Sequence, residues 1–154
     1  MATDAELAAL YQKRIRDLAS RIRVDRRLPD PQVTVTRRSR VCGSMVTLDV
    51  DFDDGRIKRI GFRTRACSLG TASTAIVVEV GPGRNQAQLK AAAQTLRDLL
   101  AEEGQPQFPS GWETLEVFAA AIPFPGRHDS IMLPFDAVEE AFRQLAGKSP
   151  GAMA

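Results

Sequence analysis

The spacing of apolar and polar residues changes period along the chain. From Asp4 to Ile22 the apolar residues recur at helical spacing, which predicts an amphipathic helix that ends before the turn Leu28-Pro29-Asp30-Pro31. From Gln32 the pattern alternates, which predicts strands over 33–39 and 45–52. Asp53-Asp54-Gly55 is a hairpin signal before a third strand over 56–66, and Ile57 falls out of step, which indicates a bulge near Lys58 and Arg59. These runs predict a three-stranded antiparallel meander.

The second half of the chain is helical in pattern. Small and apolar residues predict a buried helix over 68–80. Three more helices are expected: one that starts at Asn85 or Gln86 and is stopped by Gly104-Gln105-Pro106, one over 110–122, and one over 135–145 with Pro134 near its start. A sheet with one apolar face needs helices to cover it. The fold class is therefore α+β, a three-stranded antiparallel sheet with helices packed on one face. We expect one domain over 1–147 and a flexible tail over 148–154.

Length and composition restrict the class of protein. A chain of 154 residues with 44% hydrophobic residues suits one globular domain with a real core. Its start is acidic, and no apolar run is as long as a membrane span. We expect a cytoplasmic protein with no membrane contact, in which the two cysteines stay free of a structural disulfide.

Arginine and lysine are concentrated in the first quarter of the chain. Ten lie between Lys13 and Arg40, against three aspartates. Such a patch suits nucleic acid or an acidic protein partner. The absence of interleaved aromatic residues argues against nucleic acid and favours a solvated helix face and edge strand.

Three sites carry candidate chemistry. Cys42 lies in the corner Val41-Cys42-Gly43-Ser44 between two strands, Cys67 directly precedes a helix, and Arg127-His128-Asp129-Ser130 contains the single histidine. A helix N-terminus favours the thiolate form of Cys67. If the strands are neighbours, both sulfurs lie at one end of the sheet, where Asp129 or His128 would complete a set of ligands for zinc or an iron–sulfur cluster. The alternatives are two unrelated buried cysteines and a helix cap at His128-Asp129.

These residues, taken together, resemble a known family. Arg40-Val41-Cys42-Gly43-Ser44, a hairpin, Cys67 followed by small residues, and His128-Asp129-Ser130-Ile131 resemble, in that order, the IscU/SufU/NifU N-terminal family of iron–sulfur cluster assembly scaffolds. The resemblance extends from the first helix to the last. The long segment between Cys67 and Asp129 is more similar to the SufU branch.

The resemblance implies a set of ligands and also two departures from it. Ser44 stands where the family has aspartate, Asp129 stands where it has a third cysteine, and His128 matches the histidine of the IscU branch. The implied cluster ligands are Cys42, Cys67 and Asp129, with His128 as a further metal ligand and Ser44 at a fourth position. A carboxylate in place of a thiolate should bind soft iron–sulfur centres more weakly.

Three functions are expected from these residues. The first is a scaffold, a binding module and not a turnover catalyst, which holds iron or a labile [2Fe–2S] cluster for apoprotein clients. The second is a zinc-dependent sulfur acceptor, in which Cys42 takes sulfur from a cysteine desulfurase. The third is a degenerate paralogue that holds no metal and binds a partner through its arginine-rich first quarter.

Overall fold

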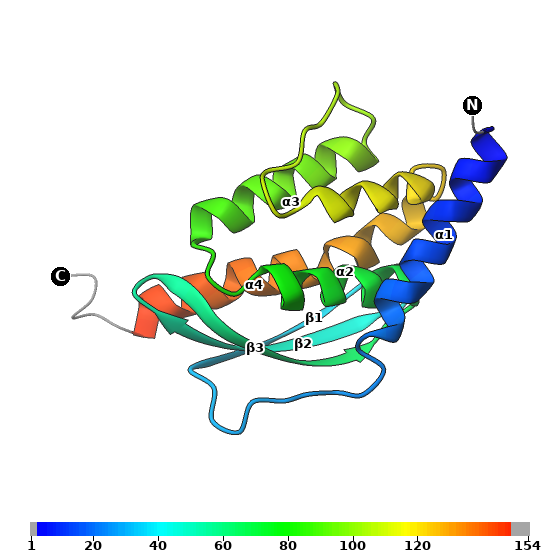
Figure 1. Ribbon diagram of the computed structural model, residues 1–154. Helices are drawn as coiled ribbons and strands as arrows, with labels where there is room; N and C mark the ends of the chain where they lie inside the picture. The colour runs from blue at the N-terminus through cyan, green and yellow to red at the C-terminus, as the bar shows by residue number, and fades with distance from the viewer. Residues whose placement is uncertain (1–2, 149–154) are drawn as a thin grey trace.

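The computed structural model describes residues 3–148 and stacks helices on one face of a small sheet (Figure 1). The elements in chain order are α1 (Asp4–Ser20), β1 (Val33–Arg38), β2 (Met45–Asp53), β3 (Arg56–Arg65), α2 (Ser68–Val80), α3 (Gln86–Leu100), the 3₁₀ helices η1 (Glu113–Ala121) and η2 (Pro125–Arg127), and α4 (His128–Lys148). The α+β prediction is confirmed.

The sheet has the order β1-β2-β3 and is antiparallel throughout. Asp54 and Gly55 form a two-residue turn in which both have positive φ, 53° and 73°, as a tight hairpin requires. The pairing shifts between Asp51 and Phe52 so that Lys58 is skipped, which confirms the predicted bulge.

The helices cover one face of the sheet. α4 packs against β1 and β2, α2 packs against β3 and α4, and α3 and η1 lie over α4 on the side away from the sheet (Figure 1). Inward residues of β2 fill the core because alternate side chains point to the same face; they include Val46, Leu48 and Val50.

The 21–32 connection crosses the opposite face of the sheet, where Figure 1 shows it below the strands. Arg26 exchanges two backbone hydrogen bonds with Phe62 at the edge of β3. Farther along, the carboxylate of Asp49 on β2 accepts hydrogen bonds from Arg27, the Leu28 N–H and Thr34. This connection therefore braces the strands that lead to both cysteines.

Several arginines of the basic first quarter have acidic partners within the fold. Arg21 pairs with Glu79, Arg27 with Asp49, and Arg37 with Glu140. These pairs attach the 21–32 connection and β1 to the rest of the domain, which supports a structural use of part of this charge.

Three helix predictions need correction. The expected helix over 110–122 is a 3₁₀ helix, η1. Leu7 and Leu10, which share the apolar spacing of the first helix, are not buried but exposed by 40% and 51%. The last helix begins at His128 and not at Phe135, because Pro134 is accommodated inside it. Ser73 of α2 donates a hydrogen bond to the carbonyl of Ile131, close to the point where Pro134 lacks an N–H. The predicted tail lies, from residue 149 onward, outside the described residues; Lys148 is the last residue of α4.

Candidate functional site

The segment Ser39–Ser44, here called the cysteine corner, holds Cys42 in a tight turn between β1 and β2. The Ser39 N–H donates to the Ser44 carbonyl at 2.8 Å and closes the turn. The Ser39 hydroxyl accepts the N–H groups of Val41 and Cys42, each at 3.3 Å. Gly43 has φ +75°, a conformation that a larger side chain would strain. Cys42 is exposed as a result.

Cys67 is the N-cap residue of α2. β3 ends at Arg65, and because β3 runs antiparallel to β2 its end lies beside the start of β2. This register brings Cys67 to the same end of the sheet as the cysteine corner. Unpaired N–H groups at the start of a helix favour a negatively charged group there.

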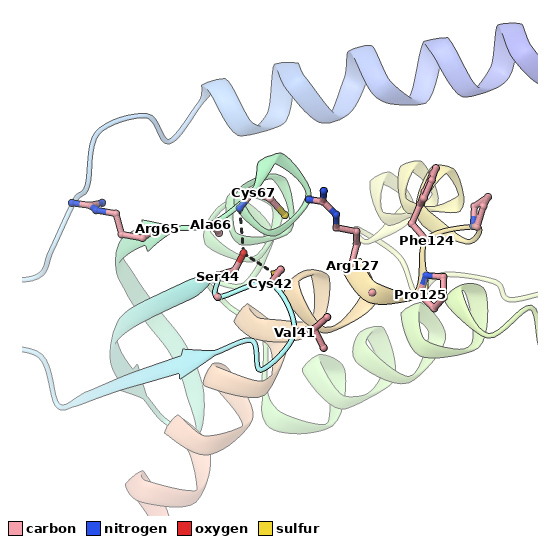
Figure 2. A pocket seen from close by; sticks show the side chains of 12 residues that line it. Val41, Cys42, Ser44, Arg65, Ala66, Cys67, Phe124, Pro125 and Arg127 are labelled. Carbon is pink, nitrogen blue, oxygen red and sulfur yellow. Dashed lines mark hydrogen bonds between the residues drawn. The ribbon is translucent and has the colours of Figure 1, made fainter.

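The Ser44 hydroxyl connects the two cysteines. It lies 3.2 Å from the Cys42 sulfur and accepts the N–H of Cys67 at 3.3 Å, and Figure 2 shows it between the two residues. Because it accepts from Cys67, its own proton is free to be donated to a Cys42 thiolate. Ser44 is buried, whereas the Cys42 residue that it contacts is exposed.

Ser130 supports Cys67 from α4. Its hydroxyl lies 3.4 Å from the Cys67 sulfur, and Ser130 is 0% exposed. Gly70 on α2 leaves the space for it, since a Cβ on Gly70 would lie 2.4 Å from the Ser130 oxygen. Helices α2 and α4 thus meet directly beneath Cys67.

Hydrogen bonds lower the pKa of both thiols. The hydroxyls of Ser39 and Ser44 lower the pKa of Cys42 from 9.0 to about 7. Burial raises the pKa of Cys67, but hydrogen bonds from Ser130, the Gly70 N–H and Arg127 outweigh it and leave the pKa of this thiol below its ordinary value. Both cysteines therefore have thiolate character, which nucleophiles and metal ligands require.

We expect alkylation of Cys42 by iodoacetamide to depend on pH as this pKa dictates. In a Cys67→Ser chain, where Cys42 is the only thiol, the rate should rise with pH and reach half its plateau near pH 7. The reason is that only the thiolate reacts, and Ser44→Ala should move the midpoint upward by removing a hydrogen bond. Ser110→Ala, at an exposed position elsewhere, is the matched control and should leave the midpoint unchanged. A midpoint near 9 in the Cys67→Ser chain would contradict the assigned hydrogen bonds.

Both cysteines line an open cavity of about 770 Å³, here called the cysteine cavity. Its lining consists of Val41, Cys42, Gly43, Ser44, Arg65, Ala66, Cys67, Pro123, Phe124, Pro125, Gly126 and Arg127. Figure 2 shows the Arg127 side chain extending toward Cys67, whereas Arg65 turns outward. Arg65 pairs there with Asp25 at 2.9 Å. Val41 and Phe124 form an apolar rim, 68% and 56% exposed.

The other two sequence-derived candidates lie elsewhere in this arrangement. Asp129 is exposed and lines a separate depression that includes Arg38, Arg40 and Arg143. The Nε2 atom of His128 donates to the carbonyl of Ala121 at 2.8 Å. Within residues 3–148 no group of three or more histidine, cysteine, aspartate or glutamate side chains is placed to hold a metal ion. The structure therefore brings together Cys42, Cys67 and Ser44, places Asp129 in a separate depression and holds His128 in a hydrogen bond to Ala121.

Sequence reasoning missed three residues that contact or flank the thiols: Ser39, Ser130 and Arg127. One signal could have found Ser130. Ile131, Phe135, Val138 and Phe142 recur at helical spacing, which extends the last helix back across Pro134 and places Ser130 within its first turn. No comparable pattern points to Ser39, whose role depends on the closed turn.

The fold places two thiols at one end of a three-stranded sheet, beside the N-terminus of a helix. The chain is therefore a small α+β domain with a thiol site. Residues 10–144 match the family described as NifU-like N terminal domain, and the chain belongs to this family. The iron–sulfur cluster assembly scaffold protein IscU of Streptococcus pyogenes serotype M1 is 27% identical over 105 residues. That alignment covers 68% of this chain and 65% of the relative, so the chain spans just under two thirds of its length.

Solved structures agree on the fold. The N-terminal part of a NifU-like protein from Brucella abortus has a TM-score of 0.83 at 30% identity, covering 90% of this chain and 95% of that one. A SUF-system scaffold protein, described as putative, from Fervidobacterium islandicum AW-1 has a TM-score of 0.77 at 19% identity, covering 87% and 97%. The second likeness concerns the fold alone. None of the helices described over residues 3–148 is long and apolar enough to cross a membrane.

Proposed function

We propose that this chain is an iron–sulfur cluster assembly scaffold, which holds a labile cluster as cargo and passes it to apoprotein clients. The observation that carries the proposal is the pair of thiols in one open cavity, each held beside hydroxyl donors that favour the thiolate. Thiolates are the soft ligands that iron–sulfur clusters take. Family membership and the IscU relative support the same function.

Cys42 and Cys67 are the proposed cluster ligands. Both face the cavity, and Cys42 is exposed enough for cargo to enter and leave without unfolding. His128 would join the ligand set only after it gives up its hydrogen bond to Ala121, and Asp129 only after it leaves the separate depression that it lines. The cysteines are therefore the first residues to test.

The test is metal and sulfide content. Chain purified without oxygen or chelators, and supplied with iron and sulfide, should contain equal amounts of iron and acid-labile sulfide, and Cys42→Ala and Cys67→Ala should each lower both at least tenfold. Asp129→Asn distinguishes a ligand from a surface carboxylate: content unchanged from the parent chain leaves Asp129 outside the ligand set. Zinc without sulfide, or no metal in the parent chain, would contradict the scaffold assignment.

A second candidate function is sulfur acceptance by Cys42 from a cysteine desulfurase, and one observation favours it. Cys42 is exposed and its pKa of about 7 makes it a nucleophile at neutral pH. Its thiolate would attack the outer sulfur of the enzyme persulfide, the sulfur–sulfur bond would break, and the enzyme cysteine would leave as a thiolate. A zinc ion would serve this role by ordering the site. Stimulation of a desulfurase that Cys42→Ala abolishes, without cluster binding, is the result that selects this function.

A further inference from the structure

The cysteine cavity supplies half of the ligands that a [2Fe–2S] cluster needs. Such a cluster is ordinarily held by four cysteine thiolates. The cavity offers the sulfurs of Cys42 and Cys67, and the described part of the chain holds no third histidine, cysteine or carboxylate grouped with them. The ligand count therefore falls short by two.

The nearby oxygen and nitrogen groups do not make up the difference. Ser130 is fully buried beneath Cys67, so its hydroxyl faces the protein and not the cavity. The Nε2 atom of His128 is hydrogen-bonded to Ala121. Asp129 lies among arginines in another depression. With these groups in their present places, the missing ligands come from outside the chain.

The charge of the cavity indicates what kind of molecule supplies them. Arg127 points into it from η2, and its lining residues include no carboxylate. Pro123, Phe124 and Pro125 add apolar contact beside this cation. A volume of about 770 Å³ is in the range of sites that hold small organic ligands. A small thiol that carries carboxylates fits both the space and the charge.

A second copy of this chain fits less well. It would bring two more cysteines, but Arg127 of one copy would approach Arg127 of the other across the shared cluster. Two like charges that face each other in a partly desolvated contact oppose association. An anionic thiol meets Arg127 with the opposite charge.

We propose that two thiolates of an anionic low-molecular-weight thiol complete the ligand set of a [2Fe–2S] cluster held by Cys42 and Cys67, an inference that rests on the proposed scaffold function. Loading is a ligand exchange from a cluster that carries four such thiolates. Two of its iron–thiolate bonds break and two bonds to Cys42 and Cys67 form. Each cysteine proton passes to a departing thiolate, and neither iron changes oxidation state. Two small thiolates stay bound.

Native mass spectrometry of the full chain tests the composition directly. The apo chain is mixed without oxygen with a [2Fe–2S] cluster carrying glutathione, and the expected species is one chain with two irons, two sulfides and two glutathiones. A single chain that keeps the cluster without any thiol overturns the inference alone, and so do two chains that share a cluster without thiol. A chain that takes up no cluster overturns the scaffold function as well.

A second test uses Arg127 and compares an anionic with a neutral thiol. A purely structural role of this arginine would not distinguish the two thiols. Arg127→Gln should raise the glutathione concentration for half-maximal cluster retention about threefold to fivefold, because an exposed charge pair is lost. Retention supported by β-mercaptoethanol, a neutral thiol, should change less than about twofold. Arg16→Gln, at an exposed arginine of α1, is the matched control. Equal effects of Arg127→Gln with both thiols would overturn the role of charge.

Discussion

Asp49→Ala should lower the free energy of unfolding by roughly 3 kcal/mol, which for 154 residues is a fall in Tm of roughly 6–12 °C. Asp49 is 0% exposed. Its oxygens accept hydrogen bonds from Arg27 at 2.7 and 3.0 Å, from the Leu28 N–H at 3.0 Å and from Thr34 at 2.7 Å. This loss lies at the low end for a broken buried ion pair because Arg27 is half exposed and regains water.

The pH dependence of this effect has a definite sign. Burial raises the pKa of Asp49, but the hydrogen bonds from Arg27, Thr34 and the Leu28 N–H outweigh it, so the folded pKa lies below the ordinary 3.8. A depressed folded pKa stabilises the protein above the unfolded pKa, and this stabilisation is lost as the pH falls through the folded value. The difference between parent and variant should therefore be constant near neutrality and shrink below about pH 4.

Urea unfolding at pH 7 and at pH 3.5 measures both effects. Asp30→Ala, in the same 21–32 connection but exposed, is the matched control and should change stability by less than about 0.5 kcal/mol. A loss below about 1 kcal/mol for Asp49→Ala would mean that the connection does not depend on this carboxylate.

The 21–32 connection, which Asp49 anchors to β2, also contacts the end of β3 that leads to Cys67. Asp25, in the same connection, accepts the Thr64 N–H at 3.2 Å and pairs with Arg65 at 2.9 Å. Arg65 is the last residue of β3, directly before Ala66 and Cys67. The position of Cys67 thus depends on a connection that contributes no residue to the cysteine cavity.

The sheet could be predicted because its pattern is local. Alternation over 33–39 and 45–52, a two-residue turn at Asp54-Gly55, and one residue out of step at Ile57 determine three strands and a bulge. The 21–32 connection could not be predicted, since its backbone pairing with Phe62 and its carboxylate partner Asp49 are nonlocal. The aspartate at 49 reads in sequence as an ordinary outward-facing strand residue.

The convergence of the two cysteines was also predictable from topology. An antiparallel meander places the β1–β2 turn and the end of β3 at one end, whatever the side chains are. The first turn of α4 was harder, because neighbours on a helix point about 100° apart. Only one of Asp129 and Ser130 can face Cys67, and the structure turns Ser130 toward it. The sequence resemblance aligns Asp129 with the third cysteine of the family, but it does not show whether Asp129 or the next residue, Ser130, faces Cys67.

This placement gives Ser130 a supporting role and not that of a ligand. A buried hydroxyl at 3.4 Å from a sulfur can donate to the thiolate and fix its direction, but it offers the cavity no surface. Ser44 does the same for Cys42 from the other side. Each cysteine of the site is therefore hydrogen-bonded to a buried serine, Cys42 to Ser44 and Cys67 to Ser130.

Gly70→Ala should destabilise the fold by about 1–3 kcal/mol, because the new Cβ would lie 2.4 Å from the Ser130 hydroxyl and 3.1 Å from the Ala66 Cβ. Ser130 is enclosed, so its hydroxyl has no free space into which to move. Ser130→Ala removes the clashing oxygen, and in that background Gly70→Ala should cost at least about 1 kcal/mol less. Urea unfolding of the parent, both single variants and the double variant measures this coupling.

Gly147→Ala is the matched control, since a Cβ there meets nothing within 4 Å and the residue lies in the last turn of α4. It should leave stability unchanged or raise it slightly. The Gly70→Ala variant should also raise the pKa of Cys67, because the Ser130 hydrogen bond that helps to lower it is displaced. The contrary result is that the losses of unfolding free energy at Gly70 and Ser130 are additive and that alkylation of Cys67 is unchanged. It would show that the contact between α2 and α4 does not hold this thiol. The support for Cys67 would then have to come from Arg127 and the N-terminus of α2 alone.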